Sequence, residues 1–363
     1  MKTALVYEWL ITRGGGEKTL ESIYKVFPSP IHTLVHAPQK LKSGVFDLQE
    51  IHTSFIQKLP FATSFYRHYL PLFPLAIEQF DLRGYDVVIS VSHAVAKGVL
   101  TTADQLHLCY CFTPIRYAWD LTHQYLEGVG GLQKAVARAC LHYLRNWDIA
   151  SLGRVDHFAT ISHAMARRIK KVYNRDSVVI YPPVNVEAIP FCDTKEEYYL
   201  TVSRMVPYKK IDLIVEAFSH LPHHKLIVVG EGPEKKRIQA LAGKNVELLG
   251  WRSDAEVREL MRKAKGFIFA ADEDFGIVVV EAQAAGTPVI AFGKGGALET
   301  VVAGETGLFF YEQTMKSLCE TICAFEKRAF DPQRIRSHAE RFNEERFSCE
   351  FKQFVELAYA RKG

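Results

Sequence analysis

The sequence predicts an α/β protein built from two doubly wound parallel sheets, and three observations support this fold class. Short apolar runs alternate along the chain with helical patterns. Most of these runs are continuous stretches of Val, Ile, Leu and Phe, which is typical of strands buried on both faces of a parallel sheet. The chain has 363 residues, of which 48% are hydrophobic and 24% charged, and this is enough for two globular domains.

The apolar runs form two series of predicted strands. The first series comprises residues 3–7, 86–90, 107–111, 157–160 and 178–181, and the second comprises 198–202, 225–229, 246–249, 266–270 and 288–291. Helices are predicted between them, for example over 211–219 and 255–264. Because ligands bind beyond the carboxyl ends of the strands in such sheets, we expect the functional residues directly after strands.

The two series are separated by the segment 181–185, Tyr-Pro-Pro-Val-Asn. Its two prolines fix φ and remove two backbone donors, which favours a boundary between domains. We therefore predict a first domain over residues 1–184 and a second over 185–341. The last segment, 342–363, is predicted to be a helix that needs an apolar surface, and its return to the first domain is a hypothesis. Its apolar residues at helical spacing are Phe347, Phe351, Phe354 and Leu357.

Composition excludes several classes of protein. The net charge of +4 gives no reason to expect nucleic acid as a partner. No apolar run reaches the length that crosses a bilayer, and the first residues are predicted to form a buried strand rather than a signal peptide. The seven cysteines lack zinc-ligand spacing and are predicted to be reduced thiols. These features predict a cytoplasmic protein.

The strongest motif is the acidic pair Glu273 and Glu281 in a strand–loop–helix context. Gly276 allows close approach of a ligand at the start of the helix, where free N–H groups and the positive dipole end favour a phosphate. Glu281, about one turn into the helix, can accept hydrogen bonds from a ribose diol, whereas Glu273 can reach hydroxyls of a sugar attached to the phosphate. The alternative for Glu281 is a solvated position on the helix surface.

A basic motif, residues 203–212, follows the predicted strand 198–202. Arg204 offers a planar fork for two phosphate oxygens and Lys209 a mobile point charge. Cations at this place would stabilise the negative charge that develops on a leaving nucleoside diphosphate. The alternative is that these residues are simply solvated basic side chains before a helix.

Together these motifs resemble the retaining glycosyltransferases of the GT-B type, whose mark is a Glu, seven residues and a second Glu. The resemblance extends from the glycine loop near the N-terminus to the C-terminal helix. It implies two Rossmann-like domains that face each other across a cleft, and sugar transfer from a nucleotide diphosphate donor. Residues 271–276 are most similar to mannosyltransferases that extend bacterial polysaccharides and O-units, often from GDP-mannose.

The resemblance also implies roles for individual residues. Glu273, Arg204 and Lys209 would be catalytic, with the two cations on the donor diphosphate and Glu273 on the donor sugar. Trp251 would lie against the base, and the turn 293–296 would help to close the pocket floor. The residues that would bind the donor are Glu281, Gly15, Gly16, Phe275, Gly276, Ile277 and Trp251. Asp274 stands where many members have Gly.

Residues 272–274 also spell Asp-Glu-Asp, a metal-binding pattern of the other large glycosyltransferase fold. That pattern belongs to a fold with one nucleotide-binding domain, and here Arg204 and Lys209 can take the electrostatic role of a metal. We therefore expect no metal and no cofactor besides the nucleotide-sugar donor substrate.

The first half carries weaker motifs. Three glycines, Gly14 to Gly16, follow the first strand and permit backbone approach to an anion, although a plain turn is the alternative. Phe112 stands where similar proteins commonly have a His that touches the donor sugar, and Phe cannot donate a hydrogen bond. His93 follows another predicted strand and is a candidate to substitute for it. Arg116 and Asp120 are further candidates on the acceptor or sugar side.

Two stretches combine aromatic or apolar residues with basic ones. The first covers residues 55–80, with Lys58, Arg67 and His68, and the second covers 133–147, with Lys134 and Arg138 among its cations. We hypothesise that they rest on the inner leaflet, at the cytoplasmic face of the membrane, and admit a polyprenyl-linked glycan acceptor. The alternative is ordinary helical core with a solvated basic edge.

Three other functions remain open from the sequence. One is a nucleotide-sugar epimerase of the same two-domain shape, and another is a non-catalytic nucleotide-sugar-binding subunit, which Phe112 favours. A Rossmann dehydrogenase is disfavoured because Gly14 to Gly16 are contiguous and do not form the G-x-G-x-x-G pattern.

Overall fold

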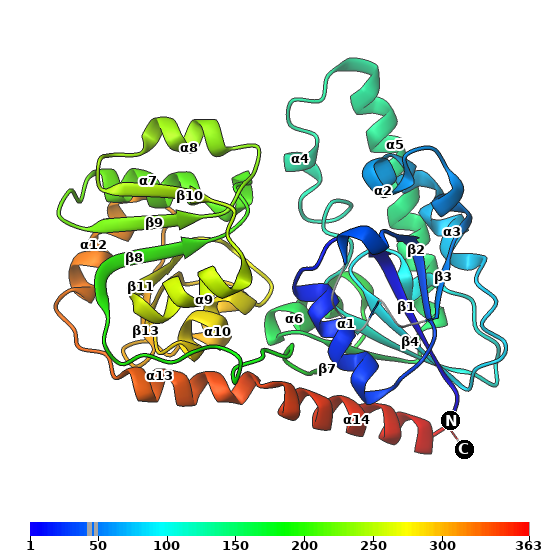
Figure 1. Ribbon diagram of the computed structural model, residues 1–363. Coiled ribbons are helices and arrows are strands. Elements are labelled where there is room, and N and C mark those ends of the chain that lie inside the picture. The colour runs from blue at the N-terminus through cyan, green and yellow to red at the C-terminus, as the bar shows by residue number, and fades with distance from the viewer. Residues whose placement is uncertain (42–45, 47–49, 363) are drawn as a thin grey trace. The chain divides into compact units, whose positions relative to one another are not determined.

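The computed structural model describes residues 1–41, 46 and 50–362, which divide into two compact units. The first unit comprises Met1–Tyr181 and Phe347–Gly363, and the second comprises Pro182–Arg346. Each unit is built around one parallel β-sheet (Figure 1). The chain therefore passes between the units twice, after Tyr181 and after Arg346.

The first unit contains a seven-stranded sheet in the order β3-β2-β1-β4-β5-β6-β7, and every pair in it is parallel. Its strands are β1 (Thr3–Leu10), β2 (Ile31–His36), β3 (Ile51–Thr53), β4 (Val87–Ser92), β5 (Leu106–Cys111), β6 (His157–Thr160) and β7 (Ser177–Val179). Its α-helices are α1 (Gly15–Val26), α2 (Ala62–Phe65), α3 (Phe73–Glu78), α4 (Thr122–Tyr125), α5 (Gly131–Ala150) and α6 (His163–Tyr173). Short 3₁₀ helices include η4 (Tyr66–Leu72), η5 (Ala96–Gly98) and η6 (Ser151–Arg154).

The second unit contains a six-stranded parallel sheet in the order β10-β9-β8-β11-β12-β13. Its strands are β8 (Glu196–Val202), β9 (Lys225–Val229), β10 (Val246–Gly250), β11 (Ala264–Phe269), β12 (Val289–Phe292) and β13 (Gly307–Phe310). Its helices are η7 (Pro207–Lys209), α7 (Ile211–Ser219), α8 (Lys235–Leu241), α9 (Asp254–Lys263), α10 (Ile277–Ala284), α11 (Ala297–Thr300), α12 (Met315–Phe325), α13 (Pro332–Ala339) and η8 (Glu340–Phe342). Helices α7, α8 and α12 pack together on one face, and α9, α10 and α13 on the other (Figure 1).

The predicted fold class is confirmed: both sheets are parallel and the second is doubly wound. All ten predicted strands are present with ends shifted by a few residues, and the predicted helices 211–219 and 255–264 correspond to α7 and α9. Three strands were not predicted, namely β2, β3 and β13. β2 mixes His and Thr with its apolar residues, and the other two have only three or four residues, so none of them shows a long apolar run.

The last helix, α14 (Glu344–Ala360), packs for most of its length on the first unit. The rings of Phe347 and Phe351 each lie with their centroid 5.8 Å from that of Tyr110 on β5. Phe351 also contacts Phe27 beside α1. Leu357, predicted to share this apolar face, is instead half exposed, while Val355 and Ala358 are buried. The chain thus begins and ends in the same unit.

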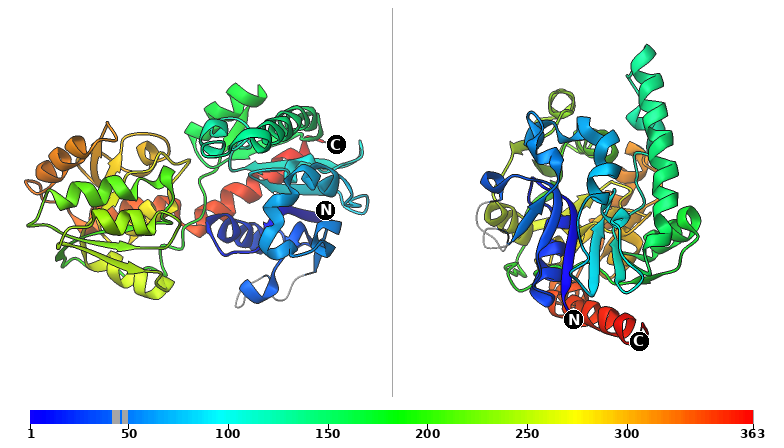
Figure 2. Two further views of the ribbon diagram at one scale, coloured as in Figure 1. Left: turned by 90° about the horizontal axis from the view of Figure 1, so that it is seen from above. Right: turned by 90° about the vertical axis from the view of Figure 1, so that its right-hand side faces the viewer.

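Helix α5 extends well beyond the sheet of the first unit, as the right-hand view of Figure 2 shows. Its C-terminal half supplies the buried residues Leu141, Leu144, Trp147 and Asp148. Its first nine residues are almost all exposed. No helix within the described parts of the chain is long and apolar enough to cross a membrane.

Candidate functional site

The carboxyl ends of β8 and β11 define the main candidate site. β8 is the first strand of the second unit, and its two neighbours in the sheet are β9 and β11. After β8 the chain forms β9 and β10 on one side of that strand. It then crosses over and forms β11 on the other side. Such a switch point leaves a crevice at the carboxyl ends of the strands, which is where open α/β sheets bind ligands.

The two motifs singled out in the second half meet at this switch point. Lys209, in the turn after β8, forms an ion pair with Glu273, in the loop after β11. Both side chains are mostly buried. Arg204 lies five residues before Lys209 in the same segment, is exposed, and makes no ion pair with any residue that the structure describes. The structure thus brings a basic and an acidic side chain into contact, and a second cation is exposed in the same segment after β8.

The acidic loop is held by the glycine turn that follows β12. The Gly296 amide donates to the Glu273 carbonyl oxygen at 2.8 Å. A methyl group on Gly295 would lie 2.3 Å from that oxygen, and one on Gly296 would lie 2.2 Å from the Phe275 Cα. Only glycine fits at these two positions, because any side chain would displace the loop. The turn 293–296 therefore acts as a support for Glu273.

Helix α10 begins directly after the acidic loop. Gly276 is its N-cap with φ of +84°, a left-handed conformation that favours glycine. Ile277 starts the helix, and Glu281 lies one turn later, about 6 Å along the axis. Phe275 is buried, and its ring contacts that of Phe342. Phe275 thus anchors the loop in the core, whereas Ile277 and Glu281 are half-buried and open to a ligand.

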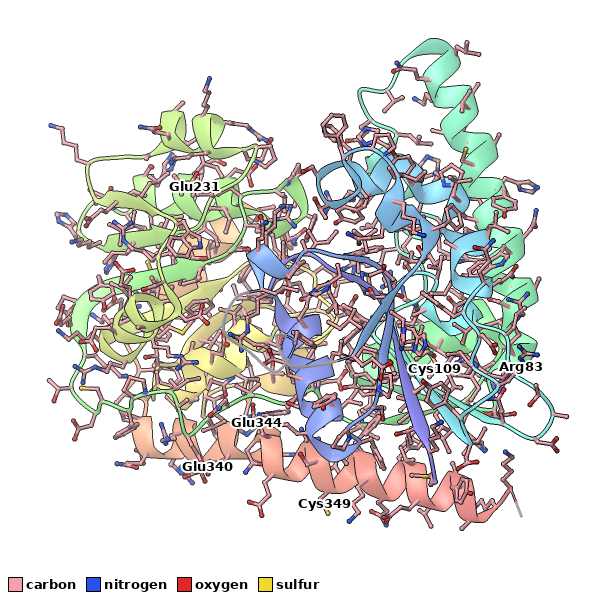
Figure 3. The ribbon with its side chains drawn as sticks, turned by 45° about the vertical axis from the view of Figure 1, so that its right-hand side comes forward. Arg83, Cys109, Glu231, Glu340, Glu344 and Cys349 are labelled. Atoms are coloured by element: carbon pink, nitrogen blue, oxygen red, sulfur yellow. The ribbon has the colours of Figure 1, made fainter. Side chains whose placement is uncertain are left out.

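The loop after β9 supports the basic segment, and sequence analysis missed it. The Met205 amide donates to the Glu231 carbonyl at 2.9 Å, and a methyl group on Gly232 would lie 2.3 Å from the Met205 carbonyl oxygen. Figure 3 labels Glu231, whose carboxylate pairs with Lys235. The signal was present in the sequence as Gly-Glu-Gly-Pro directly after an apolar run.

Trp251 directly follows β10, and its side chain is 72% exposed. β10 lies two strands from β8 and three from β11. With neighbouring strands about 4.8 Å apart, the end of β10 is roughly 10 Å from that of β8 and roughly 14 Å from that of β11. The structure therefore places Trp251 along the same edge as the Lys209–Glu273 pair without bringing them into contact.

Two of the acids in the Asp-Glu-Asp pattern are already neutralised by lysines. Asp272 Oδ2 lies 2.9 Å from Lys294 Nζ, and Glu273 pairs with Lys209. Among the described residues, no three His, Cys, Asp or Glu side chains are grouped as a metal site would require. Independence of metal remains a prediction.

In the first unit, the candidate residues follow β1, β4 and β5, which are adjacent in the sheet. His93 follows β4, and its ring lies near those of Tyr7, Trp9 and Phe112, with centroids 4.8–6.3 Å apart. Its Nδ1 lies 3.2 Å from Oε2 of Glu8, a fully buried carboxylate on β1. Glu8 was not predicted from the sequence, because a lone acid inside an apolar run carries no motif.

Gly16 of the glycine loop packs closely against Tyr7. A methyl group on Gly16 would lie 2.6 Å from the Tyr7 hydroxyl oxygen. Glu17 accepts hydrogen bonds from the Gly14 amide at 2.8 Å and the Tyr7 hydroxyl at 3.1 Å. Burial and the charge of Glu17 raise the pKa of Tyr7. Since Glu17 already places negative charge at the start of α1, close packing against Tyr7 is a sufficient reason for glycine at position 16. Gly15 is the first residue of the helix.

The loop after β5 holds Arg116 and Asp120, and several contacts fix it. Asp120 forms an ion pair with Arg168 on α6, and the Trp119 indole N–H donates to Asp148 at 2.8 Å. Arg116 is partly buried in the same loop. The carboxylate of Asp120 is thus engaged in an ion pair, and its place on the acceptor or sugar side stays a prediction.

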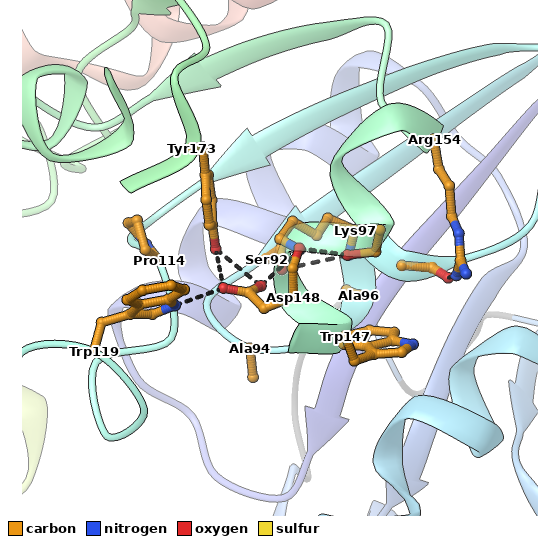
Figure 4. Close-up of polar contacts among 12 residues, drawn as sticks. Ser92, Ala94, Ala96, Lys97, Pro114, Trp119, Trp147, Asp148, Arg154 and Tyr173 are labelled. Atoms are coloured by element: carbon orange, nitrogen blue, oxygen red, sulfur yellow. Dashed lines mark hydrogen bonds and ion pairs between the residues drawn. The ribbon is translucent and has the colours of Figure 1, made fainter. Parts of the chain in front are cut away.

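A buried polar network anchors this loop to α5 and α6 (Figure 4). Lys97 and Asp148, both inaccessible to solvent, form an ion pair at 2.7 Å. Lys97 also donates to Ser151 at 2.7 Å, and the Tyr173 hydroxyl donates to Asp148 at 2.9 Å. Because every buried charge in it has hydrogen-bond partners, the network can rigidify this region.

Comparison with known proteins agrees with this geometry. Residues 185–342 match the family model for glycosyl transferases group 1. The chain is 30% identical over 172 residues to an uncharacterized glycosyltransferase of Methanocaldococcus jannaschii, covering 46% of this chain and 48% of that protein. It is 32% identical over 152 residues to the O-antigen chain mannosyltransferase RfbU of Salmonella typhimurium, covering 39% and 43%. The matched parts thus span less than half the length of these relatives.

The whole chain has a counterpart among solved structures. Anabaena HepE in complex with UDP-glucose superposes with a TM-score of 0.71 at 17% identity, covering 98% of this chain and all of that one. Two parallel α/β units and this likeness define a protein of the GT-B fold. The likeness to the group 1 glycosyltransferases is carried by residues 185–342, which form most of the second unit.

Proposed function

We propose that the protein is a retaining glycosyltransferase, which transfers a hexose from a nucleotide diphosphate donor to a glycan or lipid-linked glycan. The observation that carries the proposal is the contact between Lys209 and Glu273 at the β8/β11 switch point, with Arg204 exposed in the same segment after β8. A mixed pair of this kind suits a ligand that is anionic at its diphosphate and rich in hydroxyl groups at its sugar.

Mannose, supplied as GDP-mannose, is our first candidate for the sugar. The similarity to the O-antigen chain mannosyltransferase of Salmonella typhimurium supports mannose and an acceptor in polysaccharide or lipopolysaccharide biosynthesis. The resemblance around residues 271–276 supports GDP-mannose. A thermal-shift screen of GDP-mannose, UDP-glucose, UDP-GlcNAc and their free nucleotides tests this choice, because a bound ligand raises the apparent stability.

In the proposed reaction, the bond between the anomeric carbon and the leaving phosphate oxygen breaks. The acceptor hydroxyl oxygen forms the new bond on the same face of the sugar, and its proton passes to the leaving diphosphate. Arg204 and Lys209 would stabilise the negative charge that develops on the diphosphate. Glu273 would orient the sugar and Glu281 the ribose, so the protein would act by positioning and electrostatics. No metal is required in this scheme, and EDTA should leave the rate unchanged.

Donor turnover in two variants tests the proposal. Arg204→Ala should lower kcat by roughly 10²- to 10³-fold, the usual effect of removing a group that stabilises developing charge. Glu281→Ala should weaken donor binding, because a ribose contact is lost. Lys263→Ala is a matched control. This lysine ends α9 just before β11, so it lies at the amino end of that strand, away from the carboxyl ends where the proposed site lies. Wild-type turnover in both test variants would remove the assignment.

The product analysis separates transfer from its alternatives. Incubation of the donor alone would yield an epimer if the protein were a nucleotide-sugar epimerase. Donor binding in calorimetry without hydrolysis or transfer, whichever acceptor is supplied, would indicate a non-catalytic binding subunit. A glycosylated acceptor with the anomeric configuration of the donor supports the proposal.

We also propose that the first unit rests on an anionic membrane surface that carries the acceptor. Phe61 just before α2, Phe65 at its end, and Leu132 and Val136 on α5 are all exposed, with Leu132 at 81%. No Asp or Glu occurs in residues 51–77 or 128–147, whereas both segments contain lysine and arginine. Exposed apolar side chains with an excess of basic charge are typical of surfaces that bind anionic lipid.

A further inference from the structure

Glu8 is a buried carboxylate on β1 whose contacts all lead to the turn after β4. It is 0% exposed, and its Oε1 accepts hydrogen bonds from the Ser92 hydroxyl at 2.9 Å and the Ala94 amide at 2.8 Å. The amides of His93 and Ala96 donate to the same oxygen at 2.9 and 3.2 Å. The second oxygen, Oε2, is left to the His93 ring, with Nδ1 at 3.2 Å. One oxygen thus holds the backbone by hydrogen bonds, and the other lies within ion-pair distance of the imidazole.

His93 is the partly exposed end of this arrangement. Its side chain is 29% exposed, and its Nε2 has no hydrogen-bond partner among the residues that the structure describes. Trp9 packs edge-on against the ring with centroids 4.8 Å apart, and Phe112 lies 6.3 Å away. Because Nδ1 faces Glu8 and aromatic rings flank the imidazole, Nε2 is the nitrogen available to a ligand.

This position is the switch point of the first sheet. β1 is the first strand, and its neighbours are β2 on one side and β4 on the other. Glu8 lies near the carboxyl end of β1, and His93 lies directly after β4. The pair therefore stands where an open α/β sheet presents ligand-binding groups, as the Lys209–Glu273 pair does in the second unit.

The surrounding charges favour a protonated imidazole. The titratable groups that act on His93 are Glu8 on β1 and Glu17 on α1, and the ring of Tyr7 lies beside it. Tyr66 on η4 and Tyr117 in the loop after β5 lie farther out, near Tyr7 and Glu8. Burial alone would lower the pKa of His93, but the charge of Glu8 and its contact with Nδ1 outweigh burial, so the pKa is raised. Burial likewise opposes ionisation of Glu8, yet His93 and the backbone amides lower its pKa to about 2.

We infer that Glu8 is a positioning residue that holds His93 with Nε2–H directed to a hydroxyl oxygen of a sugar substrate. This inference rests on the proposed glycosyl transfer. A sugar hydroxyl fits better than a phosphate, because Tyr7, Trp9 and Phe112 line the position with apolar surface, and a single donor among such rings suits a neutral ligand. The pair supplies the hydrogen-bond donor that Phe112, which has no polar atom, cannot supply.

Glu8→Gln and His93→Gln test the inference through two measurements. The first is the titration of the His93 ring in the free protein, followed by NMR of ¹³C-labelled histidine and assigned by its loss in His93→Gln. The second is kcat/KM for donor turnover as a function of pH. Glu78→Gln is the matched control, since Glu78 is an ion-paired carboxylate of the same unit whose partner is Arg154.

In Glu8→Gln, we expect the His93 pKa to fall below that of the wild type and the basic limb of the pH profile to move to lower pH. Each unit of pKa lost reduces the protonated fraction about tenfold at pH values above both pKa values. At pH 8, kcat/KM should therefore fall about tenfold or more, with a much smaller loss at pH 6. Glu78→Gln should move neither the titration nor the profile.

His93→Gln leaves Glu8 and its backbone contacts in place, so it keeps the test valid if Glu8→Gln does not fold. It should lower kcat/KM at least about tenfold and abolish the basic limb. An unchanged His93 titration in Glu8→Gln, or a wild-type pH profile in His93→Gln, would overturn the inference. Addition of GDP-mannose or UDP-glucose should shift the His93 resonance, whereas GDP or UDP alone should not. If the free nucleotides shift the resonance as much as the nucleotide sugars do, a phosphate lies at Nε2 and the inference is overturned.

If wild-type protein turns over no nucleotide sugar, the proposed function fails separately. The titration of His93 in the free protein and its response to sugar-bearing ligands then still decide the role of Glu8.

Discussion

Substitution of Gly296 by alanine should disable the site without removing any functional side chain. The new Cβ would lie 2.2 Å from the Phe275 Cα and 2.6 Å from its amide nitrogen. Since non-bonded carbon atoms settle at about 3.5–4.0 Å, the two segments must separate by at least about 1.3 Å. All the nearest atoms belong to the Phe275 backbone, which cannot rotate out of the way as a side chain could.

The displaced segment carries Glu273 and starts α10, so the shift falls on groups that must be placed accurately. A misplacement of about 1 Å costs about 10²-fold in rate, and overpacking costs about 1–3 kcal/mol in stability. We expect Gly296→Ala to bind and turn over donor about 100-fold less well at 25 °C while still unfolding cooperatively. Gly153→Ala is the control, because a methyl group at Gly153 meets nothing within 4 Å. Wild-type turnover in Gly296→Ala would refute the role of this turn.

Three further predictions concern the first unit. Asp148→Asn should lower the free energy of unfolding by about 3–5 kcal/mol in urea, because it leaves the buried Lys97 charge without its partner. A decrease below about 1 kcal/mol would contradict a stabilising role for this network. The pKa of Glu8 is about 2 in the folded protein, below the unfolded value of 4.5. Glu8 should therefore contribute about 3 kcal/mol of stability that is present above pH 4.5 and lost as the pH falls toward 2. Glu8→Gln should flatten this part of the acid-unfolding curve, and an unchanged curve would argue against the lowered pKa. The double variant Leu132→Glu and Val136→Glu should float less well than wild type with anionic vesicles at low salt, and equal flotation would exclude this part of α5 from the membrane surface.

The sequence predicted the fold class because parallel strands buried on both faces leave a strong signal in apolar composition. The strands that it missed lack that signal. β2 contains two histidines and a threonine, and its pairing with β1 and β3 leaves no mark on its own composition. The end of a helix can mislead in the same way, since Leu357 has the right spacing for the buried face of α14 but is half exposed.

The site was predictable where a motif follows a strand, and less so where function depends on packing. Lys209 and Glu273 could be expected together, because β8 and β11 had to be parallel strands of one sheet, and the structure shows their ion pair. Glu8 could not be found, since its importance comes from four backbone and side-chain donors that the fold gathers around it. The pairing of Asp120 with Arg168 likewise depends on how α6 packs against the loop after β5.

The most direct test of the account is a crystal structure of the protein with a bound nucleoside diphosphate, GDP and UDP being tried in turn. We expect the diphosphate oxygens within hydrogen-bond distance of Arg204 and Lys209, at the start of α10, and the ribose hydroxyls on Glu281. A nucleotide bound away from the carboxyl ends of β8 and β11 would contradict the central claim that these residues form one donor site.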